Sequence, residues 1–451
     1  MKQLATILWK YIATKRNFRR WNDRRELEAW QNRAVQKHLA RVLPRSPFYQ
    51  QLYGNRTLKD WRDFPITNKA ALMANFDNWN TEGIQQQTAL AAALRAERSR
   101  DFAPTIGNIT VGLSSGTSGS RSLFLISPRE RHAWAGTLLA RILPGGLLEG
   151  HRAALCFRAN SNLYQSVHSR LFQFRFFDLL EPPEILAQKL MEFQPTLLVA
   201  PPALLRIFAG EKRAGRLRIQ PTRIFSVAEV LEPEERVVIE AAFGQRLHEI
   251  YQATEGFLAA TCRHGTLHLN EDVQVVQKEW LDHTHRKFIP IITDFRRTTQ
   301  PILRYRLTDI LTEREMPCPC GSIFTALEKI EGRCDDLLRF CSAHNNGVIA
   351  VFPDFVRRAI VSADDSITEY SVTLRSSGIL EISLKVRPET KVRAEQAVRG
   401  EFSLLCKTLG CQCPEIIFVP MIPSSLNEKK RRVRSERNDC LVAACSQKNG
   451  L

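Results

Sequence analysis

The sequence predicts an α/β protein in which a large domain with a mostly parallel sheet precedes a small α+β domain. Between residues 105 and 312, short apolar runs alternate with stretches of helical spacing, which is the pattern of strand–helix–strand units. From about residue 333, two alternating segments around a turn and one long helical stretch indicate a different architecture. A chain of 451 residues, 44% hydrophobic and 25% charged, is long enough for two globular domains. We therefore expect a large domain with N-terminal helices over residues 1–332 and a small domain over residues 333–451.

The first twenty residues combine apolar and basic side chains at helical spacing. Leu4, Ile7, Leu8, Tyr11 and Ile12 share one helical face, and Lys10, Lys15, Arg16, Arg19 and Arg20 crowd beside them. A basic amphipathic helix can make peripheral contact with an anionic membrane, but it packs more often on its own domain, which we expect here. Because the apolar run is too short for a signal peptide, we expect a cytoplasmic protein.

The remaining elements follow from periodicity and from breaker residues. Helices are expected at 20–43, 84–96, 129–142, 183–193, 233–243 and 391–405. Strands are expected at 109–113, 153–157, 196–200, 223–227, 247–250 and 416–419, and a hairpin is expected from 371–374 and 380–386. Because helices separate the strands of the large domain, those strands are expected to run parallel.

Six small residues follow the predicted strand 109–113 and form the most informative motif. They are Ser114, Ser115, Gly116, Thr117, Ser118 and Gly119. The glycines allow a tight loop whose backbone N–H groups converge, while the hydroxyl groups and Arg121 add donors and positive charge. The loop is neither a Walker loop nor a G-x-G-x-x-G motif, and loops of this composition are often only flexible. Its donors favour a nucleotide polyphosphate as ligand.

Four segments downstream of this loop occur in a defined order. They are Tyr251-Gln252-Ala253-Thr254-Glu255, Arg304-Tyr305-Arg306-Leu307-Thr308-Asp309, Gly332-Arg333-Cys334-Asp335-Asp336 and Glu428-Lys429-Lys430-Arg431-Arg432. With the small-residue loop, this series resembles the adenylate-forming superfamily of acyl-CoA synthetases. The resemblance is greatest to the branch of the phenylacetate–CoA ligases and of the synthetase that adenylylates a deazaflavin coenzyme, and it extends over about residues 20–435. Phrases shared with that branch are Ser46-Pro47-Phe48-Tyr49, Pro65-Ile66-Thr67-Asn68-Lys69 and Pro317-Cys318-Pro319-Cys320-Gly321.

The resemblance implies a site for ATP and Mg²⁺ and gives individual residues roles. The small-residue loop would hold the β- and γ-phosphates, Glu255 beside Thr254 would bind Mg²⁺, and Asp309 would accept hydrogen bonds from both ribose hydroxyls. Tyr251 and the turn Ala228-Glu229 would lie beside the adenine, and Arg333 would lie near the ribose or the α-phosphate. Asp335 would be the hinge of a mobile small domain. The alternatives without a function are that Glu255 is a surface glutamate, that Asp309 caps a helix and that Arg333 is a solvated arginine.

Lys429 is the residue that the resemblance places at the adenylation step. A carboxylate that attacks the α-phosphate brings two anions together, so a cation must bridge them in the transition state. A lysine suits this role because its flexible side chain can be delivered by domain rotation. The sequence has Glu428 where the family usually has glycine, and Lys430 follows, so the identity of the lysine stays open, and a solvated basic tail is the alternative. Ser122 stands where many relatives have lysine, and Arg121 is the candidate substitute for its charge.

Eleven cysteines, an odd number, argue against a disulfide framework in a long cytosolic chain. Cys262 and His268, together with Cys318 and Cys320 in a C-x-C turn, have the chemistry of tetrahedral zinc ligands. The resemblance implies such a site in this branch, which favours zinc slightly over buried free thiols. A rival cluster, Cys406, Cys411 and Cys413, is weaker because it has no histidine nearby in the sequence.

The net charge of +17 favours polyanionic partners such as nucleotides and coenzyme A, although a diffusely basic surface accounts for most of it. The resemblance implies a ligase that converts a small carboxylic acid and ATP into an acyl adenylate and pyrophosphate. The acyl group would then pass to the thiol of coenzyme A or of carrier-protein phosphopantetheine, and Asn345-Asn346-Gly347-Val348 matches a turn that lines the thiol tunnel of relatives. No nucleic-acid partner is expected.

Two other functions stay open at this point. One is adenylyl transfer to a cofactor hydroxyl, and the other is a non-enzymatic protein that binds nucleic acid or a membrane. For the ligase, Asn160, Tyr164, His168 and Phe172 are candidate residues of an acid pocket, and their aromatic and polar character suits an aryl acid.

Overall fold

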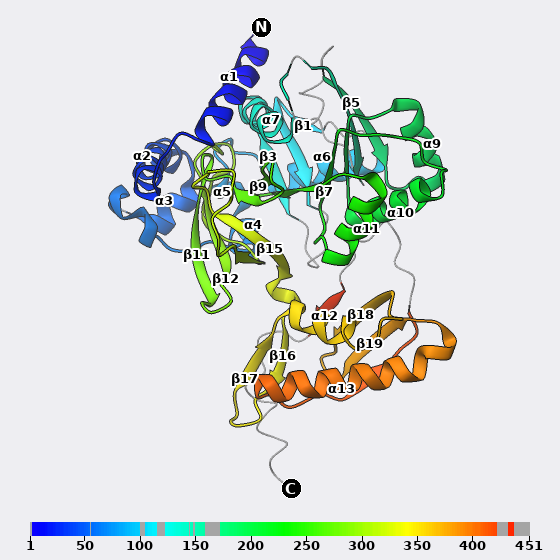
Figure 1. Ribbon diagram of the computed structural model, residues 1–451. Helices are drawn as coiled ribbons and strands as arrows, with labels where there is room; N and C mark the ends of the chain where they lie inside the picture. The colour runs from blue at the N-terminus through cyan, green and yellow to red at the C-terminus, as the bar shows by residue number, and fades with distance from the viewer. Residues whose placement is uncertain are drawn as a thin grey trace. The chain divides into compact units, whose positions relative to one another are not determined.

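The computed structural model describes residues 2–54, 56–99, 104–114, 122–143, 145–147, 149–157, 172–421 and 432–436 (Figure 1). The chain divides into two compact units. The large unit comprises Met1–Leu307 and Leu311–Ile330, and the small unit comprises Thr308–Ile310 and Glu331–Leu451. No helix in the described part of the chain is both long enough and apolar enough to cross a membrane.

The large unit begins with helices that precede its main sheet. They are α1 (Lys2–Asn17), α2 (Arg24–Val42), α3 (Pro47–Tyr53), α4 (Lys69–Ala74), α5 (Phe76–Trp79) and α6 (Gln86–Ser99). Helix α2 starts later than predicted because Asp23 caps it, its Oδ1 accepting a hydrogen bond from Glu26 N at 2.9 Å. Helices α3 and α5 hold the main sheet through Tyr49 and Trp79, whose side chains both donate to the carbonyl of Pro301.

A short antiparallel sheet lies between these helices and the main sheet in the sequence. It contains β1 (Thr105–Ile106), β2 (Ile109–Leu113) and β3 (Leu123–Ile126). The predicted strand 109–113 is therefore confirmed as β2.

One half of the main sheet is parallel and has the order β5-β4-β6-β7-β8. Its strands are β4 (His151–Phe157), β5 (Phe172–Asp178), β6 (Leu197–Ala200), β7 (Arg223–Val227) and β8 (Leu247–Ala253). Alternate residues of these strands pack on opposite faces, so that Ala154 and Leu198 contact one core cluster and Ala153 and Leu197 contact another. The first cluster includes α9 (Pro183–Phe193), α10 (Pro202–Arg213) and α11 (Pro233–Phe243), and the second includes α7 (Pro128–Ile142). The predicted α/β class is confirmed.

The other half of the main sheet is antiparallel, which the sequence analysis did not predict. It contains β9 (Gly256–Thr261), β10 (Leu267–Leu269), β11 (Gln274–Asp282), β12 (Lys287–Asp294), β13 (Ile302–Arg306), β14 (Asp309–Glu313) and β15 (Ala326–Arg333). Short turns join several of these strands, so the helix-separated pattern of the parallel half is absent from this part of the sequence.

The small unit has an α+β architecture, as predicted. A two-stranded sheet of β16 (Leu338–Cys341) and β17 (Val348–Val351) precedes α12 (Pro353–Val361). The second sheet has the order β20-β19-β18-β21, formed by β18 (Glu369–Leu374), β19 (Leu380–Lys385), β20 (Ile416–Phe418) and β21 (Val433–Ser435). The predicted hairpin is β18–β19, and the predicted helix is α13 (Lys391–Leu409), which is four residues longer than expected.

Candidate active site and metal centre

The small-residue loop connects β2 to β3, and the structure describes both of its ends. Ser114 N donates to Ser122 O at 2.8 Å, and Ser122 N donates to Ser114 Oγ at 2.8 Å. These bonds close the base of the loop. Residues Ser115, Gly116, Thr117, Ser118, Gly119 and Arg121 lie outside the described residues.

Glu255 lies in the two-residue turn between β8 and β9. Its Oε1 accepts a hydrogen bond from the Tyr305 hydroxyl at 2.9 Å, and its Oε2 accepts one from Thr254 Oγ1 at 2.9 Å. Each oxygen thus has one protein donor and keeps acceptor capacity for a cation. The structure joins two predicted motifs here, because Tyr305 belongs to the segment that ends at Asp309.

A pocket that is partly open to solvent adjoins Glu255 in the large unit. Its polar lining residues are Lys69, Ser122, Thr254, Glu255, Arg297, Gln300 and Tyr305. The pocket therefore brings the end of the small-residue loop next to a carboxylate and two cationic side chains. Sequence reasoning did not single out Lys69 as a site residue or name Arg297 at all, because neither lies in one of the five motifs.

Lys69 reaches this pocket because its segment pairs with β13. Thr67 N donates to Arg304 O, and Arg306 N donates to Thr67 O, both at 2.9 Å. Asn68 then caps α4 through its Oδ1, which accepts from Ala71 N, so Lys69 is the first residue of the helix. The shared phrase Pro65-Ile66-Thr67-Asn68-Lys69 is thus a positioning device, which its sequence alone does not reveal.

Arg297 links the pocket to the strand that follows the loop. It is buried and donates to Thr254 O at 2.5 Å and to Gln300 Oε1 at 3.1 Å. Gln300 in turn accepts from Leu125 N and donates to Leu123 O, both in β3. One network therefore holds the Glu255 turn and the β2–β3 hairpin in a fixed relation.

The residues predicted beside the adenine lie at two strand ends of the large unit. Tyr251 is in β8 and is buried in the core cluster that includes Leu258 and Ala259. Ala228 follows β7 with φ of 68°, a left-handed conformation that costs an L-residue roughly 1–2 kcal/mol. Glu229 follows it in the same turn. Backbone strain of this kind is concentrated at functional sites, which favours the predicted role of this turn.

Asp309 and Arg333 meet in the small unit, although 23 residues separate them in the sequence. Arg333 Nε lies 3.6 Å from Asp309 Oδ1, and Cys334 N donates to Thr308 O. Gly332 has φ of 132°, a conformation that L side chains rarely adopt, which explains the glycine of this motif. Asp335 lies in the turn Cys334–Asp336, and Lys429 and Lys430 lie outside the described residues.

Of the candidate acid-pocket residues, only Phe172 is described, and it is buried at the start of β5.

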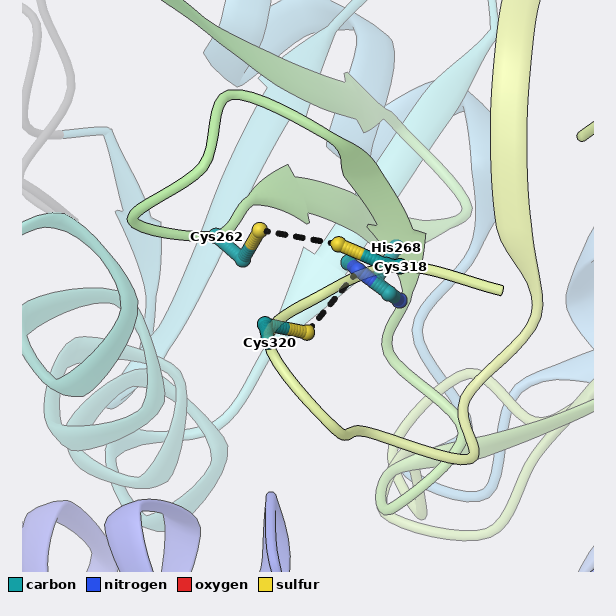
Figure 2. Close-up of side chains that lie close together, drawn as sticks. All are labelled: Cys262, His268, Cys318 and Cys320. Atoms are coloured by element: carbon teal, nitrogen blue, oxygen red, sulfur yellow. Dashed lines mark hydrogen bonds between the residues drawn. The ribbon is translucent and has the colours of Figure 1, made fainter. Parts of the chain in front are cut away.

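The four predicted zinc ligands converge at the end of the large unit's antiparallel strands. The ligand atoms of Cys262, His268, Cys318 and Cys320 all lie within 4.8 Å of one another, and all four residues are buried (Figure 2). Cys262 Sγ lies 3.6 Å from Cys318 Sγ, and Cys320 Sγ lies 3.4 Å from His268 Nε2. A tetrahedral zinc would place two sulfurs about 3.8 Å apart and a sulfur and a nitrogen about 3.5 Å apart, so both distances fit.

The surroundings of this cluster also suit a metal. His268 Nδ1 lies 3.0 Å from Phe324 O, and because a carbonyl only accepts, Nδ1 carries the proton and Nε2 keeps its lone pair. Burial lowers the pKa of His268, which keeps the ring neutral. Burial, with Cys318 and Cys262 alongside, raises the pKa of Cys320 to about 12. A dication would reverse this penalty by holding the sulfurs as thiolates.

Comparison with known proteins gives one distant sequence relative and several similar folds. No family model matches the chain. Protein CapK of Staphylococcus aureus is 26% identical over 260 residues, and the match covers 54% of this chain and 54% of CapK, about half of each.

Similar solved structures cover nearly the whole chain. A 2-hydroxyisobutyryl-CoA ligase in the postadenylation state with 2-HIB-AMP has a TM-score of 0.65 at 15% identity, over 92% of this chain and 90% of that chain. The acyl acid amido synthetase AtGH3.15 has a TM-score of 0.59 at 12% identity, over 97% of this chain and 95% of that chain. This protein therefore has the fold of the adenylate-forming ligases.

Proposed function

We propose that this protein is an AMP-forming ligase that activates a carboxylic acid with ATP. One carboxylate oxygen attacks the α-phosphorus, a new P–O bond forms, and the bond to the bridging oxygen breaks, so that acyl adenylate and pyrophosphate result. The observation that carries the proposal is the pocket in which Glu255, Lys69 and Arg297 adjoin the closed base of the small-residue loop. This pocket lies in a chain that has the fold of enzymes of this reaction class.

Glu255 would hold Mg²⁺ in this site. Both of its oxygens are positioned by hydroxyl donors, and a carboxylate is a preferred Mg²⁺ ligand. When bound, the ion would offset negative charge on the triphosphate. Tyr305 and Thr254 hold the carboxylate in place, and Arg297 holds Thr254.

Lys69 supplies the phosphate cation that the loop lacks at position 122. Lys69 and Ser122 both line the pocket, and many resembling sequences have lysine at position 122, so the Lys69 ammonium would supply this positive charge from a different segment. Arg121 is the residue predicted from the sequence to supply this charge, and separate substitutions of Lys69 and Arg121 distinguish the two candidates.

Asp309 binds the ribose, and Arg333 assists it. Arg333 lies beside the Asp309 carboxylate, and a carboxylate can accept hydrogen bonds from both ribose hydroxyls. Lys429, carried by the small unit, bridges the attacking carboxylate and the α-phosphate, and the two units act as domains that rotate about Asp335. Replacing Lys429 by Ala should abolish acyl adenylate formation but spare transfer from supplied acyl adenylate. A large loss with Lys430→Ala instead would move the assignment by one residue.

Cys262, His268, Cys318 and Cys320 hold a structural zinc ion. The donor set is complete and buried, which leaves no open position for a substrate, so the ion would crosslink the 262–268 and 318–320 turns. The zinc ion would stabilise β9, which begins directly after Glu255 and ends directly before Cys262.

The acyl acceptor is the thiol of coenzyme A or of a carrier protein. The fold is shared with a CoA ligase, but also with the amido synthetase AtGH3.15, so an amine is the second candidate acceptor. The test is a screen of pyrophosphate release with aryl, aliphatic and hydroxy acids, each with ATP and Mg²⁺. We expect acid-dependent release that coenzyme A accelerates. Product formation with amines and not with thiols would show that the acyl acceptor is an amine. Adenylylation of a cofactor hydroxyl would show that the substrate is not a carboxylic acid.

A further inference from the structure

Among the described residues, helix α1 of the large unit packs along α7 (Figure 1). Ile7 and Thr14 are buried, and Thr14 Oγ1 lies 3.5 Å from Thr137 Oγ1 of α7. A Cβ added at Gly136 of α7 would lie 2.4 Å from the carbonyl oxygen of Ile7, so glycine permits this close approach. The expected packing of the helix on its own domain is therefore confirmed, and α1 is a fixed part of the large unit.

The opposite face of α1 is apolar and exposed. Leu4, Leu8 and Ile12 follow one another at intervals of four residues and are 67%, 46% and 56% exposed, and Trp9 is 60% exposed. The single apolar face predicted from the sequence is wrong in this respect, because Ile7 points inward while Leu4, Leu8 and Ile12 point outward. Isolated exposed apolar residues are normal on soluble proteins, but four within nine residues of one helix form a contiguous patch.

Basic residues accompany this patch on α1 and directly after it. The first twenty residues contain six Lys or Arg and no Asp or Glu. Lys15 and Arg16 in the last turn of α1, and Arg19 and Arg20 directly after it, are exposed. The Lys10 ammonium lies 4.5 Å from the centre of the Trp9 ring, which shows how a basic side chain accompanies the apolar surface.

We propose that α1 docks the large unit onto an anionic lipid surface. Exposed leucine, isoleucine and tryptophan would enter the interface between headgroups and acyl chains, while Lys15, Arg16, Arg19 and Arg20 contact lipid phosphates. A second copy of this chain is a poorer occupant, because pairing two such surfaces would bring like charges together. The consequence for function is that the ligase would work at a membrane, where acids with long apolar chains collect.

Vesicle co-sedimentation of the full chain tests this docking. Phosphatidylcholine vesicles are compared with vesicles that also contain phosphatidylglycerol, at low and at high salt. We expect binding to the anionic vesicles alone, weakened by salt. Binding should fall by more than about tenfold in Leu4→Gln/Leu8→Gln/Ile12→Gln. In Lys15→Gln/Arg16→Gln it should fall about fivefold for each charge removed.

Matched variants on other exposed helix surfaces control for general changes in surface. Val237→Gln in α11 and Arg95→Gln/Arg98→Gln in α6 replace similarly exposed residues and should bind as the native protein does. No binding to anionic vesicles, equal binding to neutral ones, or a dimer in solution that the α1 variants dissociate would each overturn the proposal. The α1 variants should keep acid-dependent pyrophosphate release, so the docking and the ligase proposals fail separately.

Discussion

The thiol cluster and the residues that we propose to bind the nucleotide differ in how completely one unit supplies them. The cluster takes all four ligands from the large unit, and these ligands are buried with their ligand atoms within 4.8 Å of one another. Of the residues that we propose to bind the nucleotide, Glu255 and Lys69 belong to the large unit, and Asp309 and Arg333 belong to the small unit. A metal site that stabilises a fold can be complete in one unit, whereas residues that we propose to act during a reaction can belong to units that move.

Replacing Asp309 should give the largest effect on the proposed nucleotide site. Asp309→Ala removes the carboxylate that we propose to hold both ribose hydroxyls, and each hydrogen bond to a charged group contributes about 1.5–3 kcal/mol. Pyrophosphate release at limiting ATP should therefore fall by about a hundredfold or more. Asp365→Ala, an exchange of another aspartate in the same unit, is the control. Near-native turnover of Asp309→Ala with native circular dichroism would remove Asp309 from the nucleotide site.

Replacing two ligands should give the largest effect on the compact site. Cys318→Ser/Cys320→Ser should release about one zinc per chain and lower the free energy of unfolding by several kcal/mol, because a buried site would lose its crosslink. Elemental analysis and thermal denaturation measure the two quantities. Cys413→Ser, at an exposed cysteine, should change neither. Native protein purified without chelator that contains no metal would leave the buried-thiol interpretation.

The buried residue His38, which belongs to neither the thiol cluster nor the proposed nucleotide site, gives a prediction for the pH dependence of stability. Burial lowers the pKa of this histidine from 6.5 to about 4. The unfolded chain binds the proton below pH 6.5 and the folded chain does not until about pH 4, so stability is full above pH 6.5 and falls as the pH drops through this window. At pH 5 the loss relative to pH 7 should be about 2 kcal/mol. Chemical denaturation of His38→Gln should show a smaller loss, and the exposed His283→Gln should match the native protein; equal losses in all three proteins would contradict the assignment.

The smallest effect is expected for Lys69. If its ammonium contacts the triphosphate beside other donors, Lys69→Ala should lower kcat/KM for ATP by about tenfold. Lys59→Ala, at an exposed lysine ten residues earlier, should have no effect. An unchanged kcat/KM for Lys69→Ala would leave Arg121 as the candidate for the cation that contacts the triphosphate.

Local patterns predicted the parallel half of the sheet, whereas the thiol cluster was predicted from the donor chemistry of its residues and from the resemblance. The strands around Leu197 and Arg223 are separated by amphipathic helices, and Cys262, His268, Cys318 and Cys320 have a donor chemistry that few other functions share. The antiparallel strands and the position of Lys69 at the pocket were missed because they depend on pairing between distant segments, as in Thr67 with Tyr305. Spacing along the chain carries no signal for such a pairing.

The central claim, that this protein adenylates an acid, is tested most directly by exchange of labelled pyrophosphate into ATP. The native protein with Mg²⁺ should catalyse exchange only when a suitable carboxylic acid is present, since reversal of acyl adenylate formation is the sole source of labelled ATP. The same acid should give acyl adenylate by mass spectrometry, and Asp309→Ala should give neither. Exchange that proceeds without any acid, or no exchange with aryl, aliphatic or hydroxy acids while ATP binds, would contradict the account.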